Sequence, residues 1–315
     1  MNNNTLLYFL HCMTPVHVGA GQGVGAIDMP MIREKVTQWP LFPGSSMKGV
    51  HRDYFRAKQK LDSSQEKTKS SWVDIAFGDS EDQGLAGAIV MSDARILAFP
   101  VNSQYGTFAY ATCPMVLKRL HRDIQAANGE NSLLDKLIDV TLEDNQAWIC
   151  KGSKLVDVSK SDSKADSKEK KLQLDEFTID ATISSDLTDW TKNISKQLFK
   201  DNDNAQTMLV ERMVLISDAA FQYFVTMCSE IVARIRISAE TKTVERGALW
   251  NEEYLPTEAL LYGMIWIDEH LSKNPQLGDV GLSQVFEEKA FLQIGGNTTV
   301  GKGRVRCSYV RGEGQ

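Results

Sequence analysis

The stretch from Pro15 to Gly49 constrains the fold of this chain more than any other segment. An apolar run leads into the glycine-rich sequence HVGAGQGVGAID, and FPGSSMKG follows at the start of a basic helix. Glycines permit positive φ angles and close approach of a ligand to the backbone. A helix that starts at Ser45 or Ser46 leaves backbone N–H groups free, and these favour an anion. The order of these features predicts a cradle for an RNA backbone, with one exposed carboxylate, Asp28, beside it.

The overall charge of the chain argues against nucleic-acid binding. The 315 residues carry a net charge of −6, so any nucleic-acid surface must be a local cluster of basic residues. Helical spacing provides one such cluster, because Lys48, Arg52 and Arg56 follow one another at every fourth position of the helix expected over residues 45–60. We expect these three side chains to lie on one solvent-facing line and to contact phosphates.

A second glycine loop, GGNTTVGKG, lies near the end of the sequence. It differs from a Walker A loop because Gly303 replaces the hydroxyl residue that would hold magnesium, and NTP hydrolysis is therefore not expected. Beyond the loop, two-residue spacing puts Lys302 and Arg304 on one face of a final strand. The glycines Gly295 and Gly296 with this basic face suit a phosphate backbone, although basic edges also protect sheets from aggregation.

The first glycine loop is not a dinucleotide site, because it does not satisfy GxGxxG and Pro30 opposes an immediate helix. A flexible loop without a ligand is the alternative. Asp28 gains interest from its place between this loop and the basic helix, with His17 eleven residues upstream. His17 is either a packed histidine or a group for ligation or proton transfer. Magnesium usually takes one or two carboxylates with water and phosphate, so RNA would complete a metal site at Asp28.

A polar, threonine-rich segment, RIRISAETKTVERGALWNEEYLP, is typical of a hairpin that projects from a core. Glu252, Glu253 and Tyr254 lie on its return strand, where charged residues are usually only solvated. The low-complexity segment 155–172 has too little apolar surface to fold alone and predicts a loop. We expect one domain over 1–315, with 155–256 as an insertion that holds this loop and the hairpin.

The remaining pattern predicts an α+β fold, because helices and strands mix without regular β-α alternation. The first and last strands are expected to be neighbours in the sheet. The other expected elements are strands at 5–13, 87–99, 208–216, 230–238, 243–250 and 259–267, and helices from about 112, at 217–229 and at 281–290.

Five scattered cysteines without CxxC spacing indicate reduced, buried thiols. The N-terminal sequence MNNNTLLYFL has no basic leader, and 18 consecutive apolar residues occur nowhere, so neither a signal peptide nor a membrane span is expected. These features predict a cytoplasmic protein.

Taken together, HVGAGQGVGAID, FPGSSMKG, AFGDS with GAIVMSDA, ALWNEEYLP and IGGNTTVGKGR resemble the RAMP superfamily of CRISPR proteins. The likeness covers nearly the whole chain and is greatest to the repeating backbone subunit of type III-B, or Cmr, effector complexes. It implies an RRM-like (ferredoxin-like) core with a thumb hairpin, copies that stack along guide RNA, and cleavage of complementary target RNA at regular intervals.

The resemblance also implies roles for individual residues. The catalytic aspartate of the family falls on Asp28, its loop histidine on His17, and its guide-contacting lysine on Lys48. An acidic residue and a tyrosine near the thumb fall on Glu252 and Tyr254. Family cleavage requires a divalent ion, here expected to be Mg²⁺ or Mn²⁺, and attack by the 2′-hydroxyl of the RNA itself leaves cyclic phosphate ends.

Two other functions remain compatible with these residues. The first is a catalytically silent guide-RNA scaffold of the same fold, in which Asp28 only shapes its loop. The second is a monomeric nuclease that processes guide RNA, which is disfavoured because the thumb-like segment suits stacking better.

Overall fold

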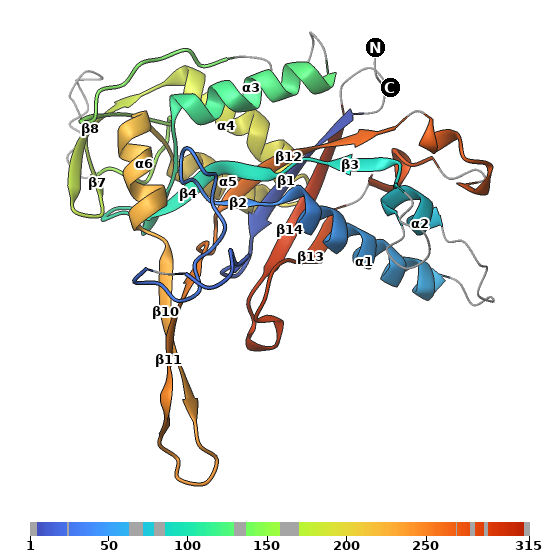
Figure 1. Ribbon diagram of the computed structural model, residues 1–315. Coiled ribbons are helices and arrows are strands. Elements are labelled where there is room, and N and C mark those ends of the chain that lie inside the picture. The colour runs from blue at the N-terminus through green and yellow to red at the C-terminus, as the bar shows by residue number, and fades with distance from the viewer. Residues whose placement is uncertain are drawn as a thin grey trace.

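A large mixed sheet with helices around it forms the body of the protein, and a long two-stranded hairpin projects from it (Figure 1). The computed structural model describes residues 5–23, 25–62, 72–78, 86–128, 137–157, 170–268, 270–277, 281–286 and 289–311. Helices and strands mix as expected for an α+β fold, and the arrangement is consistent with an RRM-like core.

Twelve strands make up the large sheet. Ten of them follow one spatial order: β13 (Ala290–Gln293), β14 (Arg304–Arg311), β1 (Thr5–Cys12), β12 (Leu260–Ile267), β4 (Ala94–Asn102), β5 (Phe108–Thr112), β9 (Met213–Ile216), β6 (Gln146–Ile149), β8 (Phe177–Ile183) and β7 (Lys170–Leu174). The short strands β2 (Leu41–Phe42) and β3 (Ile89–Met91) pair with β4 and β12.

Strand β1 is an interior strand of the sheet, third in order from the β13 edge. It pairs antiparallel with β12 on one side and with β14 on the other, so the first and last strands are neighbours as expected. Its residues Leu6 to Leu10 are all buried, which agrees with a run that is apolar on both faces. Gly263 of β12 lies opposite Tyr8, and a Cβ there would lie 2.4 Å from the tyrosine ring.

In the described residues, six helices pack around this sheet: α1 (Gly44–Asp62), α2 (Trp72–Phe77), α3 (Pro114–Asn128), α4 (Ser185–Leu198), α5 (Asp203–Arg212) and α6 (Asp218–Met227). Helix α1 contacts α2, β3 and β13, whereas α3 and α4 contact β1. None of the helices in the described part of the chain is both long and apolar enough to cross a membrane.

Helix α1 buries a histidine that the sequence reading did not single out. His51 is fully buried, and its ring lies between those of Tyr8, Tyr309 and Phe286. Its Nδ1 contacts the carbonyl oxygen of Met47 at 2.8 Å. Burial lowers the pKa of His51 to about 4, because an apolar surrounding disfavours the charged imidazolium. The histidine is therefore neutral at pH 7.

Two expected elements were wrong in part. The strand expected at 208–216 is β9 only from Met213 onward, and the rest belongs to α5. Asn202 caps the start of that helix by accepting a hydrogen bond from the N–H of Ala205, which stabilises the helical turn that follows. The helix expected at 281–290 is a single 3₁₀ turn, Gln284–Phe286, followed by β13.

The low-complexity segment ends in ordered structure. Residues 158–169 lie outside the described residues, but Lys170 begins β7, which forms a hairpin with β8. The range 155–256 therefore holds two different structures. Strands β7, β8 and β9 extend the large sheet, and only the hairpin forms a sheet of its own.

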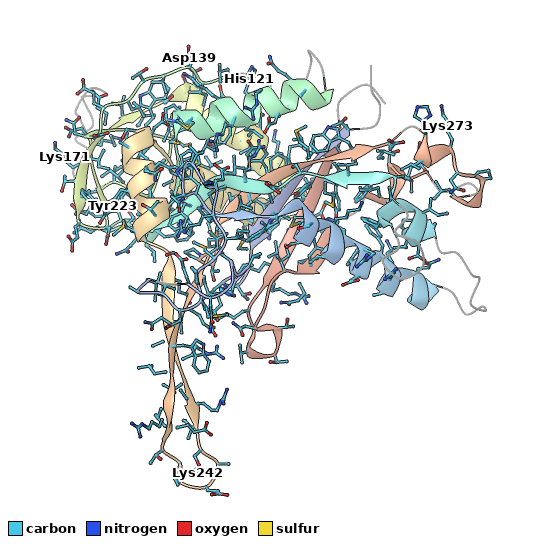
Figure 2. The ribbon with its side chains drawn as sticks, in the orientation of Figure 1. His121, Asp139, Lys171, Tyr223, Lys242 and Lys273 are labelled. Atoms are coloured by element: carbon cyan, nitrogen blue, oxygen red, sulfur yellow. The ribbon has the colours of Figure 1, made fainter. Side chains whose placement is uncertain are left out.

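That hairpin, the thumb, consists of β10 (Glu230–Ile237) and β11 (Val244–Tyr254). Its register shifts by a bulge between Ile235 and Ile237. Figure 2 shows Lys242 at the far end of the thumb, away from the sheet. The projecting arm is confirmed, and its return strand brings residues 250–254 back to the body of the protein.

Candidate functional site

The loop that follows β1 lies along the base of the thumb. Val16 bridges to Leu255, and Met29 bridges to Glu252 in β11. The N–H of Met29 donates to the carbonyl oxygen of Asn251 at 3.0 Å, and the N–H of Glu253 donates to that of Met29 at 3.0 Å. The glycine loop is therefore held as an added strand-like edge of the thumb.

Asp28 lies in this edge with its side chain exposed. Its Oδ2 accepts a hydrogen bond of 2.7 Å from the backbone N–H of Asn251, and its carbonyl oxygen accepts one from Gly23. Among the described residues, Oδ1 has no hydrogen-bond partner. The carboxylate is thus oriented by the thumb while one of its oxygens faces solvent.

His17 is buried close to the same strand, with 7% of its surface exposed. Its Nδ1 lies 2.7 Å from the carbonyl oxygen of Glu253. A carbonyl only accepts, so Nδ1 carries a hydrogen, and Nε2 of the neutral ring is an acceptor. Nε2 points towards Gly19, where an added Cβ would lie 2.8 Å away. Burial and this bond favour a positioned histidine, and the structure leaves its chemical role a prediction.

Glu252 and Tyr254, two residues apart in β11, share one face of the strand and are buried, with 6% and 0% of their surfaces exposed. Glu252 accepts hydrogen bonds from the indole N–H of Trp250 at 2.8 Å, the amide of Asn297 at 2.9 Å and the hydroxyl of Tyr254. Arg234 lies 3.9 Å from the same carboxylate. These groups form one closed polar network at the base of the thumb.

The network fixes the charge of its members. Burial alone would raise the pKa of Glu252, but hydrogen bonds from Tyr254 and Trp250 and the charge of Arg234 hold that pKa below its usual value. Burial and the neighbouring Glu252 raise the pKa of Tyr254 to about 12. Glu252 is therefore an ionised acceptor, and Tyr254 is a neutral donor. The ring of Tyr254 is fully covered in this arrangement and leaves no exposed face for an RNA base.

The second glycine loop closes over this network. The N–H of Gly296 donates to the carbonyl oxygen of His17 at 3.0 Å, and a Cβ on Gly295 would lie 2.0 Å from that oxygen. The ammonium of Lys302 lies 4.7 Å above the ring of Tyr254 and 3.3 Å from Glu230. Arg304 is exposed beside the ring of Phe291. RNA contact at Gly295, Gly296, Lys302 and Arg304 stays a prediction; Lys302 is half-buried and the other three are exposed.

The start of α1 differs from the expected anion site. The helix begins at Gly44, whose N–H donates to Oδ1 of Asp93 at 2.8 Å, so a carboxylate already occupies part of that position. Ser45 is exposed and Ser46 half-buried, and neither is a helix cap. No local sequence pattern indicates Asp93, because its contact depends on the break between β3 and β4.

The basic line on α1 is also less free than expected. Arg56 forms an ion pair of 2.6 Å with Asp74 of α2. Lys48 and Arg52 are half-buried, and burial together with the charge of Arg52 lowers the pKa of Lys48. Lys48 and Arg52 therefore remain the better candidates for phosphate contact.

A third carboxylate, that of Glu253, is linked to α6 through Arg33, which also donates to the carbonyl oxygen of Val225. Glu253 is 3% exposed and accepts hydrogen bonds from Arg33 at 2.6 Å, Ser229 at 2.6 Å and the N–H of Met31 at 3.0 Å. It fastens the far end of the glycine loop. Glu253 lies on a strand where charged residues were expected to be solvated, and Asn297 was not singled out from sequence. Only the contacts of the two residues in the fold reveal their roles.

Within the part of the chain that the structure describes, no three histidine, cysteine, aspartate or glutamate side chains come together as metal ligands. Asp28 offers one solvent-facing carboxylate oxygen and fits a divalent cation as a single ligand, with the remainder left to water and substrate. The five cysteines are all free thiols; Cys228 is half-buried and the other four are buried.

Comparison with known proteins places this geometry in a family. The RAMP superfamily profile matches residues 9–306. The chain belongs to the RAMP superfamily. Over 307 residues, which cover 95% of this RAMP protein and 93% of the relative, it is 34% identical to the CRISPR system Cmr endoribonuclease Cmr4 of Pyrococcus furiosus.

Solved structures agree with this membership. The RAMP protein aligns with oligomeric Cmr4 from Pyrococcus furiosus at a TM-score of 0.68 and 28% identity, covering 98% of each chain. A chain of a type III-B Cmr-β complex bound to cognate target RNA aligns at a TM-score of 0.68 and 20% identity, covering 97% of this chain and 96% of that one. The second likeness shows a shared fold.

Proposed function

We propose that this chain is a repeating backbone subunit of a type III-B CRISPR effector complex, which stacks along guide RNA and cleaves complementary target RNA. The observation that supports cleavage most directly is the exposed Asp28 carboxylate, oriented by the N–H of Asn251 in a chain 34% identical to a Cmr endoribonuclease. Stacking is supported by the oligomeric state named for the similar Cmr4 structure. Its partners are then guide RNA, target RNA, further copies of itself and other effector subunits.

The proposed reaction is an internal transesterification of the RNA. The 2′-oxygen forms a bond to the adjacent phosphorus, and the bond from phosphorus to the 5′-oxygen breaks. Asp28 orients the 2′-hydroxyl and accepts its proton, while the leaving 5′-oxygen takes a proton from water. The products are a cyclic phosphate and a 5′-hydroxyl, so no net water or oxidant is consumed.

The same proposal includes dependence on Mg²⁺ or Mn²⁺. Asp28 would supply the protein ligand, and the cation, when bound, would offset negative charge on the phosphate. His17 is proposed to hold the loop that carries Asp28, through its bond to the carbonyl oxygen of Glu253. The free thiols of all five cysteines support a cytoplasmic place of action.

Sequence specificity in this proposal comes from base pairing between guide and target, and the protein contacts backbone and shape. A chain with a net charge of −6 is compatible with this role, because RNA contact is confined to local basic positions such as Lys48, Arg52 and Arg304.

The test is cleavage of a complementary RNA by the assembled, guide-loaded complex in Mg²⁺, with EDTA and a non-complementary RNA as controls. Regularly spaced products that disappear in EDTA support the proposal. Tight target binding without products identifies a non-catalytic guide-RNA scaffold, the alternative in which Asp28 only shapes its loop. Cutting of repeat RNA by the monomer alone identifies a guide-processing nuclease.

A further inference from the structure

The second glycine loop contains one residue whose backbone conformation is unusual for its type. Asn297 has φ 61° and ψ 30°, in the left-handed region that favours glycine. Its neighbours Gly295, Gly301 and Gly303 also have positive φ, and these positions are filled by glycine. Asparagine tolerates this region better than most residues, but glycine would adopt it at lower cost. An interaction of the asparagine side chain must therefore offset the cost of this backbone conformation.

The amide group of Asn297 supplies that reason. Its Nδ2 donates to Oε2 of Glu252 at 2.9 Å and lies 2.8 Å from the hydroxyl of Tyr254, so the amide sits between two buried groups of the thumb base. The carbonyl oxygen of Asn297 accepts from the N–H groups of Val300 and Lys302, which closes the loop around it. The left-handed turn aims the amide at β11.

The same loop is fastened to the segment that leads to Asp28. The N–H of Gly296 donates to the carbonyl oxygen of His17, and the N–H of Gly303 donates to that of Pro15 at 2.9 Å. The loop that bears Asn297 thus contacts two other parts of the chain. Gly296 and Gly303 bind the start of the Asp28 loop, and the Asn297 amide binds the end of β11. Within β11, Asn251 and its N–H lie next to Glu252 in the strand.

Glu252 has little capacity left for chemistry of its own. It is nearly buried, accepts three hydrogen bonds and faces Arg234, and its pKa is held low. A general base or a metal ligand needs an open lone pair that faces the substrate. The carboxylate instead provides an ionised anchor to which the Asn297 amide binds, and hydrogen bonds to charged groups are the stronger kind.

We infer that Asn297 is a positioning residue for RNA cleavage: its amide locks Glu252 and Tyr254, and through β11 it fixes the Asn251 N–H that orients Asp28. This inference rests on the proposed function for its effect on cleavage, but the positioning itself is independent of it. Asn297 touches no RNA in this account. Its loss therefore lowers the rate of the chemical step while guide and target binding persist.

Asn297→Gly is the decisive variant, because glycine keeps the left-handed backbone and removes only the amide. Asn297→Asp keeps both the size and the tolerance for this conformation but places a second carboxylate against Glu252. Thr299→Ala is the matched control, since Thr299 is exposed in the same loop and has no hydrogen-bond partner among the described residues. All three are assembled into guide-loaded complexes.

Three readouts are taken from each complex. Single-turnover cleavage at saturating complex reports the chemical step, and target affinity is measured separately. Hydrogen exchange of the peptide 249–255 reports the order of the Asn251 N–H without any need for cleavage. Losing a hydrogen bond to a charged group predicts a rate lower by about tenfold or more in Asn297→Gly, and lower still in Asn297→Asp. Target affinity should stay within about twofold, and exchange at 249–255 should rise by a comparable factor.

The outcomes separate the two claims. A wild-type rate and unchanged exchange in Asn297→Gly would show that only the backbone conformation matters, and would overturn the positioning role. Equal losses of target affinity and rate would also overturn it, because they indicate a general structural defect. If the wild-type complex does not cut, the proposed function fails, and the exchange of 249–255 still decides whether Asn297 orders the thumb base.

Discussion

The carboxylate of Asp28 accepts a hydrogen bond from the backbone N–H of Asn251 at 2.7 Å, across more than two hundred residues of sequence. The loop after β1 and the return strand of the thumb therefore share responsibility for the orientation of one exposed side chain. This relationship separates two properties of Asp28, its negative charge and its ability to accept that bond.

Asp28→Ala should abolish target cleavage while guide assembly and target binding remain, because an exposed side chain contributes no core packing. Asp28→Asn is the matched variant, since its amide oxygen can still accept from Asn251 while the charge is lost. We expect both variants to be inactive in a cleavage assay. The melting temperature of Asp28→Asn should be closer to that of the wild-type protein than the melting temperature of Asp28→Ala. Full cleavage by Asp28→Asn would show that the charge is dispensable.

Glu252→Ala and Tyr254→Ala should slow cleavage by less than Asp28→Ala does.

Lys48→Ala should weaken guide RNA retention. Each lost phosphate contact should flatten the salt dependence of binding by about 0.7 in log–log slope for single-stranded RNA. Adding Arg52→Ala should flatten it further, whereas Arg56→Ala should mainly cost stability, about 0.2–1 kcal/mol, through the ion pair with Asp74. Lys192→Ala on α4 serves as the control for simple loss of positive charge. An unchanged slope in the Lys48 and Arg52 double variant would place both on a solvated face.

The buried His51 should make the protein less stable below neutral pH. Its pKa falls from 6.5 to about 4 on folding, so the unfolded state binds more protons between these values. Stability from this residue is complete above pH 6.5 and is lost as the pH falls towards 4, by roughly 3 kcal/mol. His51→Phe should flatten the dependence of melting temperature on pH in that window, and the exposed His270→Phe should not. Equal slopes in the two variants would contradict this account.

Glu252 should affect the stability of the fold at a lower pH than His51 does. Because its pKa is lowered on folding, its stabilising effect is present above its usual pKa of 4.5 and disappears as the pH falls through the lower folded value. Glu252→Gln removes that dependence but keeps the size of the side chain. Melting temperatures of the wild-type protein and the variant should therefore converge as the pH drops below about 4.5. A constant difference across all pH values would mean that the charge of Glu252 does not stabilise the fold.

Deleting residues 158–169 should be tolerated if a short glycine-serine linker replaces them. The ordered flanks already meet, since Val156 bridges antiparallel to Leu172. We expect soluble protein with a nearly unchanged melting temperature, because the deleted sequence is polar apart from Val158 and Ala165. Extending the deletion through Leu174 is the control, and it should destabilise the protein by removing the strand that pairs with β8.

Local sequence patterns predicted most of the elements. The apolar run of β1, the helix α6 and the thumb strands follow directly from periodicity and turn residues. The strand expected at 208–216 was wrong at its start, because the cap at Asn202 keeps a helix through residue 212. Asp28 could be chosen from sequence because its charge stands between a glycine loop and a basic helix.

The rest of the site depends on contacts between distant segments. Nothing near Asn297 in sequence indicates that its amide reaches Glu252, and nothing near Gly44 indicates that Asp93 takes its N–H. Burial also determines which residues chosen from the sequence are accessible to RNA. The resemblance matched Tyr254 to a tyrosine near the thumb, and in the structure its ring is buried beneath Lys302. Such contacts follow from tertiary packing, which spacing along one chain does not encode.

The pairing of β1 with β14 has a consequence for biosynthesis. A ribosome releases Thr5–Cys12 early, yet that strand keeps one edge without its β14 neighbour until Arg304–Arg311 have emerged. An apolar strand with an unpaired edge is prone to pair with other chains, and such distant pairings form slowly. During translation β1 therefore lacks this neighbour until nearly all of the chain has been synthesised. Chaperone protection at this stage should matter more for the yield of folded protein than the stability of the finished fold.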